Sequence, residues 1–219
     1  MSLDAALSVH LGRFALDVAF RVDDGEVLAL VGPNGAGKTT ALGALAGLVA
    51  LERGRIALGG VVLDDPDAGV FVPPEARGIG FVFQDGRLFP HLSALENVAF
   101  GLRAQGLPRR ASRARARDWL ERMGIGALVH ARASTLSGGE ARKVALARAL
   151  AISPRALLLD EPFASLDEDA QRDVRETLRR HLAEFAGPCV LVTHDPEDTR
   201  MLAGRALRLV DGRCGQEDS

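Results

Sequence analysis

Tyrosine is absent from this sequence of 219 residues, and cysteine and lysine occur only twice each. Cys189 lies in the apolar run PCVLVTH and Cys214 in the polar segment near the end, so neither indicates a disulfide framework. A reducing compartment fits this cysteine usage. Because only Lys38 and Lys143 are present, arginine supplies nearly all the positive charge, and a lysine inside a motif is informative.

Long apolar runs are also missing. The longest, residues 41–51, is interrupted by glycine and is well short of the roughly 18 residues that a membrane span needs. The N-terminus does not combine a basic start with an apolar run, so we expect no signal peptide. These absences predict a soluble protein, although one that is able to dock on a membrane protein.

A strong charge of either sign is lacking too, since the formal net charge is −2 and the pI about 6.2. The arginine-rich segment RRASRARARDWLERMG is therefore a local feature. We interpret it as the solvated face of a helix in preference to a nucleic-acid-binding patch, and we expect no nucleic-acid partner.

Short apolar segments alternate with helical patterns along most of the chain. The predicted strands are FALDVAFRV, VLALV, GRIALGG, IGFVF, ALLLD, CVLVTH and ALRLV. The predicted helices outside the central block are 39–51, 138–152, 168–184 and one that begins at Asp195. This alternation predicts an α/β fold with a mainly parallel sheet, and residues 215–219 are expected to fray.

The central block, residues 86–135, has a helical pattern only. The capping-box sequence Ser93–Glu96 begins a helix to about Arg103. A second helix is predicted from Arg109 to Met123, and a third, short one to about Arg132. We interpret the block as a helical subdomain inserted into an α/β core. The predicted division is 1–85 and 136–219 for the core and 86–135 for the insert.

The segment GPNGAGKTT matches the pattern G-x-x-x-x-G-K-S/T between an apolar strand and a helix, which is the context of a phosphate-binding P-loop. Glycines let successive N–H groups point inward, and the helix N-terminus favours an anion. Lys38 supplies a compact charge for the β- and γ-phosphates, and Thr39 a hydroxyl for Mg²⁺. The predicted nucleotide-binding residues are Gly32, Pro33, Asn34, Gly35, Ala36, Gly37, Lys38, Thr39 and Thr40.

A P-loop of this kind needs a carboxylate at a strand end to hold the metal. The strand ALLLD ends in Asp160, and Glu161 follows directly. We assign Asp160 to the Mg²⁺ shell and Glu161 to polarising the attacking water.

A second glycine-rich segment, LSGGE, lies about a hundred residues further along. Ser137 and Glu140 form a capping box, which explains these two residues but not Gly138 and Gly139, since glycine weakens a helix. Paired glycines at a helix start suit close approach to an anion. If two copies meet head to tail, each LSGGE covers the γ-phosphate held by the other copy's P-loop.

With these motifs the chain resembles an ABC-type ATPase, the nucleotide-binding subunit of ABC transporters, along essentially its whole length. The matching motifs, in family order, are Walker A at Gly32–Thr39, the Q-loop glutamine Gln84, the signature LSGGE, Walker B ALLLDE, the D-loop Ser165–Asp167 and the switch histidine His194. The resemblance implies a RecA-like α/β core, an N-terminal antiparallel β element, the helical insert, and two ATP molecules at the interface of a homodimer.

The resemblance also assigns roles. It makes Glu161, His194 and Gln84 catalytic, and Thr39, Gln84 and Asp160 the groups around Mg²⁺. It places Ser137, Gly138 and Gly139 on the nucleotide of the other copy. Gln84 then links the Mg²⁺ to the helical subdomain, which grips transmembrane permease subunits at the cytoplasmic side of the membrane.

The sequence departs from the family pattern at the adenine. The family usually stacks an aromatic residue, often tyrosine, on the base, but Leu11 falls at about that place, and we expect Phe14 to substitute. Glu140 stands where glutamine is frequent and Lys143 where arginine is usual. We expect neither change to abolish ATP use.

The segments PPEARGIG and QDGRLFPH most resemble the ATPase of molybdate importers. Such ATPases often carry a further C-terminal oxyanion-binding β-domain, which this sequence does not show, and their cargo is chosen by a substrate-binding protein and the permease. Importers of sulfate, iron or polyamine are alternatives. A non-transport ABC ATPase of DNA repair or translation is a further alternative, and a nucleotide-binding module without hydrolysis is disfavoured by Glu161 and His194.

Overall fold

The computed structural model describes residues 2–215. Of the segment predicted to fray, 215–219, only Gly215 is described, and its N–H donates to the Arg208 carbonyl at 2.7 Å. The strands are β1 (Ser2–Leu11), β2 (Phe14–Asp23), β3 (Val27–Val31), β4 (Arg53–Leu58), β5 (Val61–Asp65), β6 (Val70–Phe71), β7 (Ile79–Val82), β8 (Ala156–Asp160), β9 (Cys189–Val192), β10 (Arg205–Val210) and β11 (Arg213–Cys214). The α-helices are α1 (Lys38–Ala46), α2 (Ala94–Ala104), α3 (Arg109–Arg122), α4 (Gly138–Ala151), α5 (Glu168–Glu184) and α6 (Pro196–Leu202). Three 3₁₀ turns are η1 (Pro74–Ala76), η2 (Gly126–Leu128) and η3 (Ala133–Thr135).

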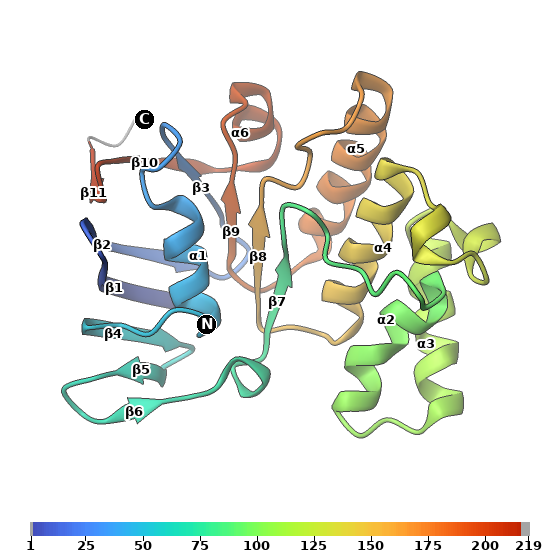
Figure 1. Ribbon diagram of the computed structural model, residues 1–219, viewed down its shortest axis with the longest axis horizontal. Helices are drawn as coiled ribbons and strands as arrows, with labels where there is room; N and C mark the ends of the chain where they lie inside the picture. Colours follow the sequence, from blue (N-terminus) through green and yellow to red (C-terminus); the bar gives the residue numbers. More distant parts are fainter. Residues whose placement is uncertain (1, 216–219) are drawn as a thin grey trace. The chain divides into compact units, whose positions relative to one another are not determined.

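Within residues 2–215 the strands form one eleven-stranded sheet, in the order β6-β5-β4-β1-β2-β11-β10-β3-β9-β8-β7. Strands β10, β3, β9 and β8 pair in parallel, which confirms for this half the parallel sheet predicted from the alternation. Strands β6, β5, β4, β1 and β2 pair antiparallel and form the N-terminal β element that the resemblance implied (Figure 1). The fold is therefore mixed α/β.

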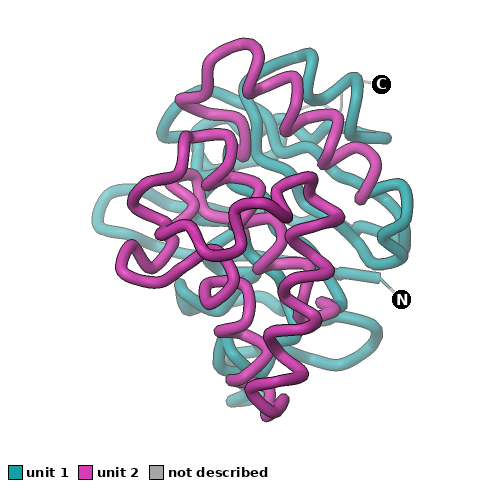
Figure 2. The backbone as a smooth tube through the Cα atoms, turned by 90° about the vertical axis from the view of Figure 1, so that its right-hand side faces the viewer, with its two compact units in different colours: residues 1–81, 155–161, 182–219 teal, residues 82–154, 162–181 magenta. Residues whose placement is uncertain are grey.

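The chain divides into two compact units, shown in Figure 2. Unit 1 comprises residues 1–81, 155–161 and 182–219, and unit 2 comprises 82–154 and 162–181. The predicted insert, 86–135, falls wholly within unit 2, which also includes α4 and most of α5. The division into core and insert at 86 and 135 stays a prediction.

The core of unit 1 lies between α1 and the sheet. Helix α1 buries Leu42 and Leu45 against residues such as Leu28, Leu30 and Val190 of the central strands. These strands are apolar in nearly every position because the parallel part of the sheet is covered. The packing fixes the start of α1 beside the end of β3.

Unit 2 is helical. Helix α2 contacts both α3 and α4, and the predicted apolar side of α3 is confirmed, with Ala116, Leu120 and Met123 buried. Trp119 on the same side is only half-buried, and its ring lies 5.8 Å from that of His181 in α5.

Two helix predictions are wrong. The helix predicted over 39–51 ends at Ala46, because Gly47 adopts a left-handed conformation at φ 78° and caps it. The third helix of the insert, predicted to about Arg132, is absent from the described residues there, where only the 3₁₀ turn η2 forms. Gly47 is a local signal for a helix end, but the apolar pattern continues to Leu51 and favoured the longer helix. The segment before Arg132 has no caps to mark a helix.

Candidate functional site

The phosphate cradle lies in unit 1, between β3 and α1. The N-cap of α1 is Gly37, and no side chain caps the helix start. Because the first N–H groups of a helix have no partner within the helix, this terminus offers its donors to an anion. Gly37 has φ 101°, and a Cβ there would lie 2.7 Å from Cζ of Phe14, so the loop requires glycine at this position.

Lys38 is held over its own loop. Its side chain is buried, and Nζ donates hydrogen bonds to the carbonyl oxygens of Gly32 at 2.8 Å and Pro33 at 2.9 Å. Two carbonyl dipoles balance the ammonium charge only in part. The positive charge therefore remains available for a phosphate at the N-terminus of α1.

The predicted metal groups Thr39 and Asp160 meet in unit 1. Thr39 Oγ1 donates to Asp160 Oδ1 at 3.3 Å, and Asp160 is buried at the end of β8. Within residues 2–215 no group of three or more histidine, cysteine or acidic side chains is arranged to hold a metal. One carboxylate and one hydroxyl fit Mg²⁺, which binds few protein oxygens and keeps waters and substrate phosphates. The donor set thus suits a cation that arrives with a nucleotide.

Glu161 and His194 also lie side by side in unit 1. The backbone N–H of Glu161 donates to the Val192 carbonyl at 3.0 Å, which joins the ends of β8 and β9. Glu161 Oε1 is 3.7 Å from His194 Nδ1. Glu161 has φ 43°, a conformation that costs a non-glycine residue energy and that is found more often at functional sites.

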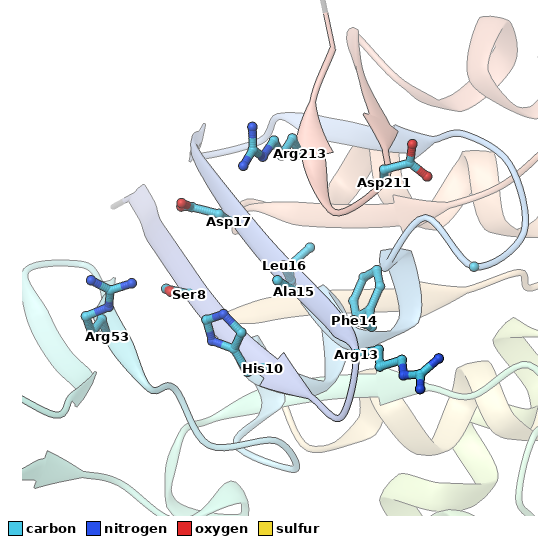
Figure 3. A pocket seen from close by; sticks show the side chains of 11 residues that line it. Ser8, His10, Arg13, Phe14, Ala15, Leu16, Asp17, Arg53, Asp211 and Arg213 are labelled. Atoms are coloured by element: carbon cyan, nitrogen blue, oxygen red, sulfur yellow. The ribbon is translucent and has the colours of Figure 1, made fainter.

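Phe14 lines a cavity of about 550 Å³ beside the P-loop (Figure 3). Gly35 of the loop lines the same cavity, and so do His10, Arg13 and Arg213. Leu11, which pairs with Phe14 across the β1–β2 hairpin, is half exposed and is not among the lining residues. Phe14 was predicted from its aromatic ring, but its polar neighbours were missed. Arg53 and Arg213 reach the cavity from strands β4 and β11, which are distant in sequence.

The signature residues lie in unit 2 at the start of α4. Ser137 Oγ accepts from the Glu140 N–H at 3.3 Å and Glu140 Oε2 accepts from the Ser137 N–H at 2.8 Å, so the predicted capping box is confirmed. Ser137 and Gly138 are exposed.

The two signature glycines have a packing role within the chain that sequence reasoning missed. A Cβ on Gly138 would lie 3.0 Å from Leu166, and a Cβ on Gly139 would lie 3.2 Å from Ala170 of α5. The helix start therefore packs too closely on residues 166–170 for larger side chains. Approach to an anion is not the only reason for these glycines.

The predicted site residues thus form two groups. Unit 1 holds the P-loop, Phe14, Asp160, Glu161 and His194, and unit 2 holds Gln84, the signature and the D-loop Ser165–Asp167. Gln84 follows β7, and its backbone carbonyl accepts a hydrogen bond from Arg142 of α4.

A strand, a glycine-rich turn and a helix that carry such a lysine, with a hydroxyl–carboxylate pair at a nearby strand end, define a P-loop protein. The family whose sequence pattern matches residues 16–164 is described as ABC transporter. The chain belongs to the ABC transporter family.

Several relatives have been described. The chain is 46% identical to the molybdenum import ATP-binding protein ModC of Mycobacterium tuberculosis, over 92% of this chain and 56% of ModC. It is 42% identical to the molybdate/tungstate import ATP-binding protein WtpC of Archaeoglobus fulgidus, over 97% of this chain and 85% of WtpC. An Fe(3+) ions import ATP-binding protein, FbpC of Streptomyces avermitilis, is 41% identical over 99% of this chain and 61% of its own length. The chain thus spans little more than half of ModC.

Among solved structures, the ATP-binding cassette MJ0796, in a dimeric post-hydrolysis state bound to ADP and Pi, superposes with a TM-score of 0.84 and 29% identity. The match covers 100% of this chain and 98% of MJ0796. The ABC ATPase fold predicted from the sequence is confirmed.

Proposed function

We propose that this chain hydrolyses MgATP and drives a membrane importer. The observation that carries the proposal is the set of groups at the carboxyl ends of β3, β8 and β9 in unit 1. Lys38 and Thr39 begin α1, Asp160 meets Thr39, and Glu161 meets His194. Ligands of open α/β sheets bind at this edge of the strands.

Each residue has a proposed role in the reaction. The N–H groups of residues 32–40 and Lys38 bind the phosphates, and Phe14 contacts the adenine from the cavity wall. Thr39, Asp160 and the Gln84 amide would hold Mg²⁺, which would supply positive charge to the phosphates. The Glu161 carboxylate orients the attacking water and accepts its proton, and His194 donates to the γ-phosphate.

A head-to-tail homodimer completes the site. The exposure of Ser137 and Gly138 supports this proposal, because the signature presents its free surface to a partner. The MJ0796 cassette, which is a dimer in its state with ADP and Pi, supports it as well. In the proposed dimer the signature of one copy covers the γ-phosphate held by the other copy.

Permease subunits are the proposed partners of unit 2, through its α2–α3 part and the segment after β7. The rings of Phe89 and Phe100 lie 4.7 Å apart, and Phe100 is 47% exposed although it is apolar. An exposed aromatic ring packed on a half-buried one suits a helix of a partner protein. Within residues 2–215 no helix has the length and apolarity that crossing a bilayer requires. As the partner of permease subunits, the chain is proposed to act as a peripheral subunit on the cytoplasmic side of the membrane.

The proposed cargo is molybdate or a related oxyanion, delivered through a substrate-binding protein that meets the permease. The names of ModC and WtpC support this choice, together with the segments PPEARGIG and QDGRLFPH. The similarity to FbpC keeps an iron importer as the second candidate. Molybdate uptake by cells that contain the chain with its permease tests the choice, since iron uptake without molybdate uptake rejects it.

Replacement of Glu161 by glutamine tests the enzymatic proposal. Glu161→Gln keeps the shape of the side chain but removes the proton acceptor, so phosphate release from MgATP should fall about a hundredfold or more. The Kd for ATP, measured by calorimetry, should change little, whereas Lys38→Ala should abolish binding. Glu176→Gln, on the exposed face of α5, is the matched control with normal turnover. Undiminished hydrolysis by Glu161→Gln rejects the assigned role.

A further inference from the structure

Helix α4 carries two arginines that face one backbone segment of unit 2. Arg142 and Arg148 are six residues apart with Ala145 midway, so the three side chains share one face of the helix. The segment opposite, residues 83–87, follows β7 and includes Gln84; we call it the Q-loop segment. Ala145 Cβ lies 3.7 Å from the position of a Cβ on Gly86, so the segment rests on α4 between the two arginines.

Each guanidinium binds two carbonyl groups of the Q-loop segment. Arg142 donates from Nη1 to the Phe83 oxygen at 2.8 Å and from Nη2 to the Gln84 oxygen at 2.5 Å. Arg148 donates from Nη1 to the Arg87 oxygen at 2.8 Å and from Nη2 to the Gly86 oxygen at 2.7 Å. Four of the five carbonyl oxygens of residues 83–87 thus accept hydrogen bonds from two planar guanidinium groups. The single ammonium group of a lysine does not reproduce this geometry.

The segment needs such support because its backbone is tightly turned. The Gly86 N–H donates to the Phe83 oxygen at 2.8 Å, and Arg87 has φ 40°, an unfavourable value for a residue with a side chain. The Arg87 guanidinium lies 4.3 Å from the centre of the Phe83 ring. The guanidinium groups of Arg142 and Arg148 stabilise a backbone conformation that the segment alone does not favour.

Arg142 is buried and Arg148 is partly buried. Arg142 is 6% exposed, and burial lowers the pKa of its guanidinium, an effect that the negative charge of Asp85 opposes. Burial also lowers the pKa of Arg148. Since a buried cation is costly without partners, the carbonyl contacts must persist for the charges to stay there.

Arg142 also reaches a second loop. Its Nη2 lies 3.5 Å from the carbonyl oxygen of Ala164, directly before the D-loop at Ser165. One guanidinium therefore touches the segment that carries Gln84 and the segment that leads to the D-loop, and it projects from the helix whose first turn is the signature.

We propose that Arg142 and Arg148 are positioning residues that fix the Gln84 backbone to the signature helix, with Arg142 also holding the approach to the D-loop. Any movement of α4 is then transmitted to residues 83–87, and the position of Gln84 depends on the two guanidinium groups. The effect on turnover rests on the proposed ATPase function, whereas the effect on the backbone does not.

Hydrogen exchange and kinetics of Arg142→Met test this proposal. Methionine keeps an unbranched apolar side chain but removes the guanidinium donors to the Phe83 and Gln84 carbonyls. The Phe83 oxygen still accepts from the Gly86 N–H. Exchange of amides in residues 83–87, Gly86 above all, should be about tenfold faster. The kcat for ATP should fall about tenfold to a hundredfold while KM stays within about threefold, because the P-loop contacts are untouched.

Arg142→Lys and Arg179→Met complete the experiment. Lysine keeps the positive charge on a single ammonium group, so Arg142→Lys should restore part of the exchange protection and part of kcat. If the methionine variant does not fold, the lysine variant should still show faster exchange than the unaltered chain. Arg179→Met removes an exposed arginine of α5 and should change neither quantity. Unchanged exchange at 83–87 in both Arg142 variants overturns the proposal, even if the chain shows no ATPase activity.

Discussion

Among the described residues of unit 1, Arg77 is the most deeply buried charged residue, with none of its side chain exposed. It donates to the carbonyl oxygens of Ala44 and Leu45, at the end of α1, and forms an ion pair of 2.9 Å with the buried carboxylate of Asp64. The positive charge stabilises the negative end of the helix dipole. A residue of the PPEARGIG segment thus secures the helix whose other end holds the P-loop.

Loss of the Arg77 guanidinium should therefore be costly. Arg77→Met leaves Asp64 buried without its ion-pair partner, so the free energy of unfolding in urea should fall by about 3–5 kcal/mol. The double variant Asp64→Leu with Arg77→Met removes the orphaned charge and should recover part of that loss. A double variant less stable than Arg77→Met contradicts the ion-pair explanation.

At the scale of single residues, the sequence predicted the site residues that lie together in one motif. It missed the contacts between side chains and backbone groups that are distant in the chain. Lys38 and Thr39 belong to a nine-residue motif with a fixed geometry, so their place at the start of α1 followed from the pattern. Arg77 and Arg142 reach carbonyls 32 or more residues away in the chain. Carbonyl groups are the same in every residue, so no sequence pattern marks such contacts.

Among the helices, α4 and α2 use similar start sequences differently. Both begin with a serine cap three residues before a glutamate, but only α4 completes the capping box. In α2 the Glu96 carboxylate turns instead to Arg103 at 2.6 Å and Arg113 of α3 at 2.5 Å. The predicted capping box of α2 is half formed. The Glu96 carboxylate gains more from charge-assisted bonds to two guanidinium groups than from one bond to the Ser93 N–H.

The stability contribution of Glu96 should depend on pH. Burial opposes its ionisation, but the hydrogen bonds from Arg113 and Arg103 outweigh burial, and the pKa of Glu96 lies below its ordinary value. Such a group stabilises the fold above the unfolded pKa of about 4.3, and the contribution is lost as pH falls through the lower folded value.

Glu96→Gln should therefore lower the free energy of unfolding by about 1 kcal/mol at pH 7, with the difference from the unaltered chain shrinking below pH 4. Urea unfolding at both pH values measures it, with Glu121→Gln, an exposed residue of α3, as control. A difference that is constant with pH excludes the ion pairs as its cause.

Helix positions were easier to predict from sequence than their ends. Helix α5 spans the predicted 168–184, and α4 ends one residue before the predicted Ile152, because Ser153-Pro154 stops it. The end of α1 depends on Gly47, a local signal that the continuing apolar pattern outweighed, and on contacts from Arg77, which no local pattern reveals. Strands β1, β5, β6 and β11 were not predicted. β6 and β11 have only two residues each, and β6 lies at one edge of the sheet.

At the scale of the whole molecule, the alternation of strands and helices predicted the parallel half of the sheet but not the strand order. β3 lies between β10 and β9, strands that come more than 150 residues later.

The motifs assign nucleotide binding to unit 1 and the signature to unit 2, yet the signature glycines also pack on residues 166–170. The exposure of Ser137, more than the glycine pair, is the reason to expect a second copy.

The central proposal is that two copies clamp the nucleotide, and the molar mass in solution tests it most directly. Light scattering of Glu161→Gln should give the 23.2 kDa of one chain without nucleotide and twice that mass with MgATP. Adding Ser137→Arg to this variant should keep ATP binding but hold the mass at one chain, whereas adding Ala111→Arg, on the exposed side of α3, should leave the dimer intact. ATP-dependent dimers that form equally well with Ser137→Arg would contradict the clamp.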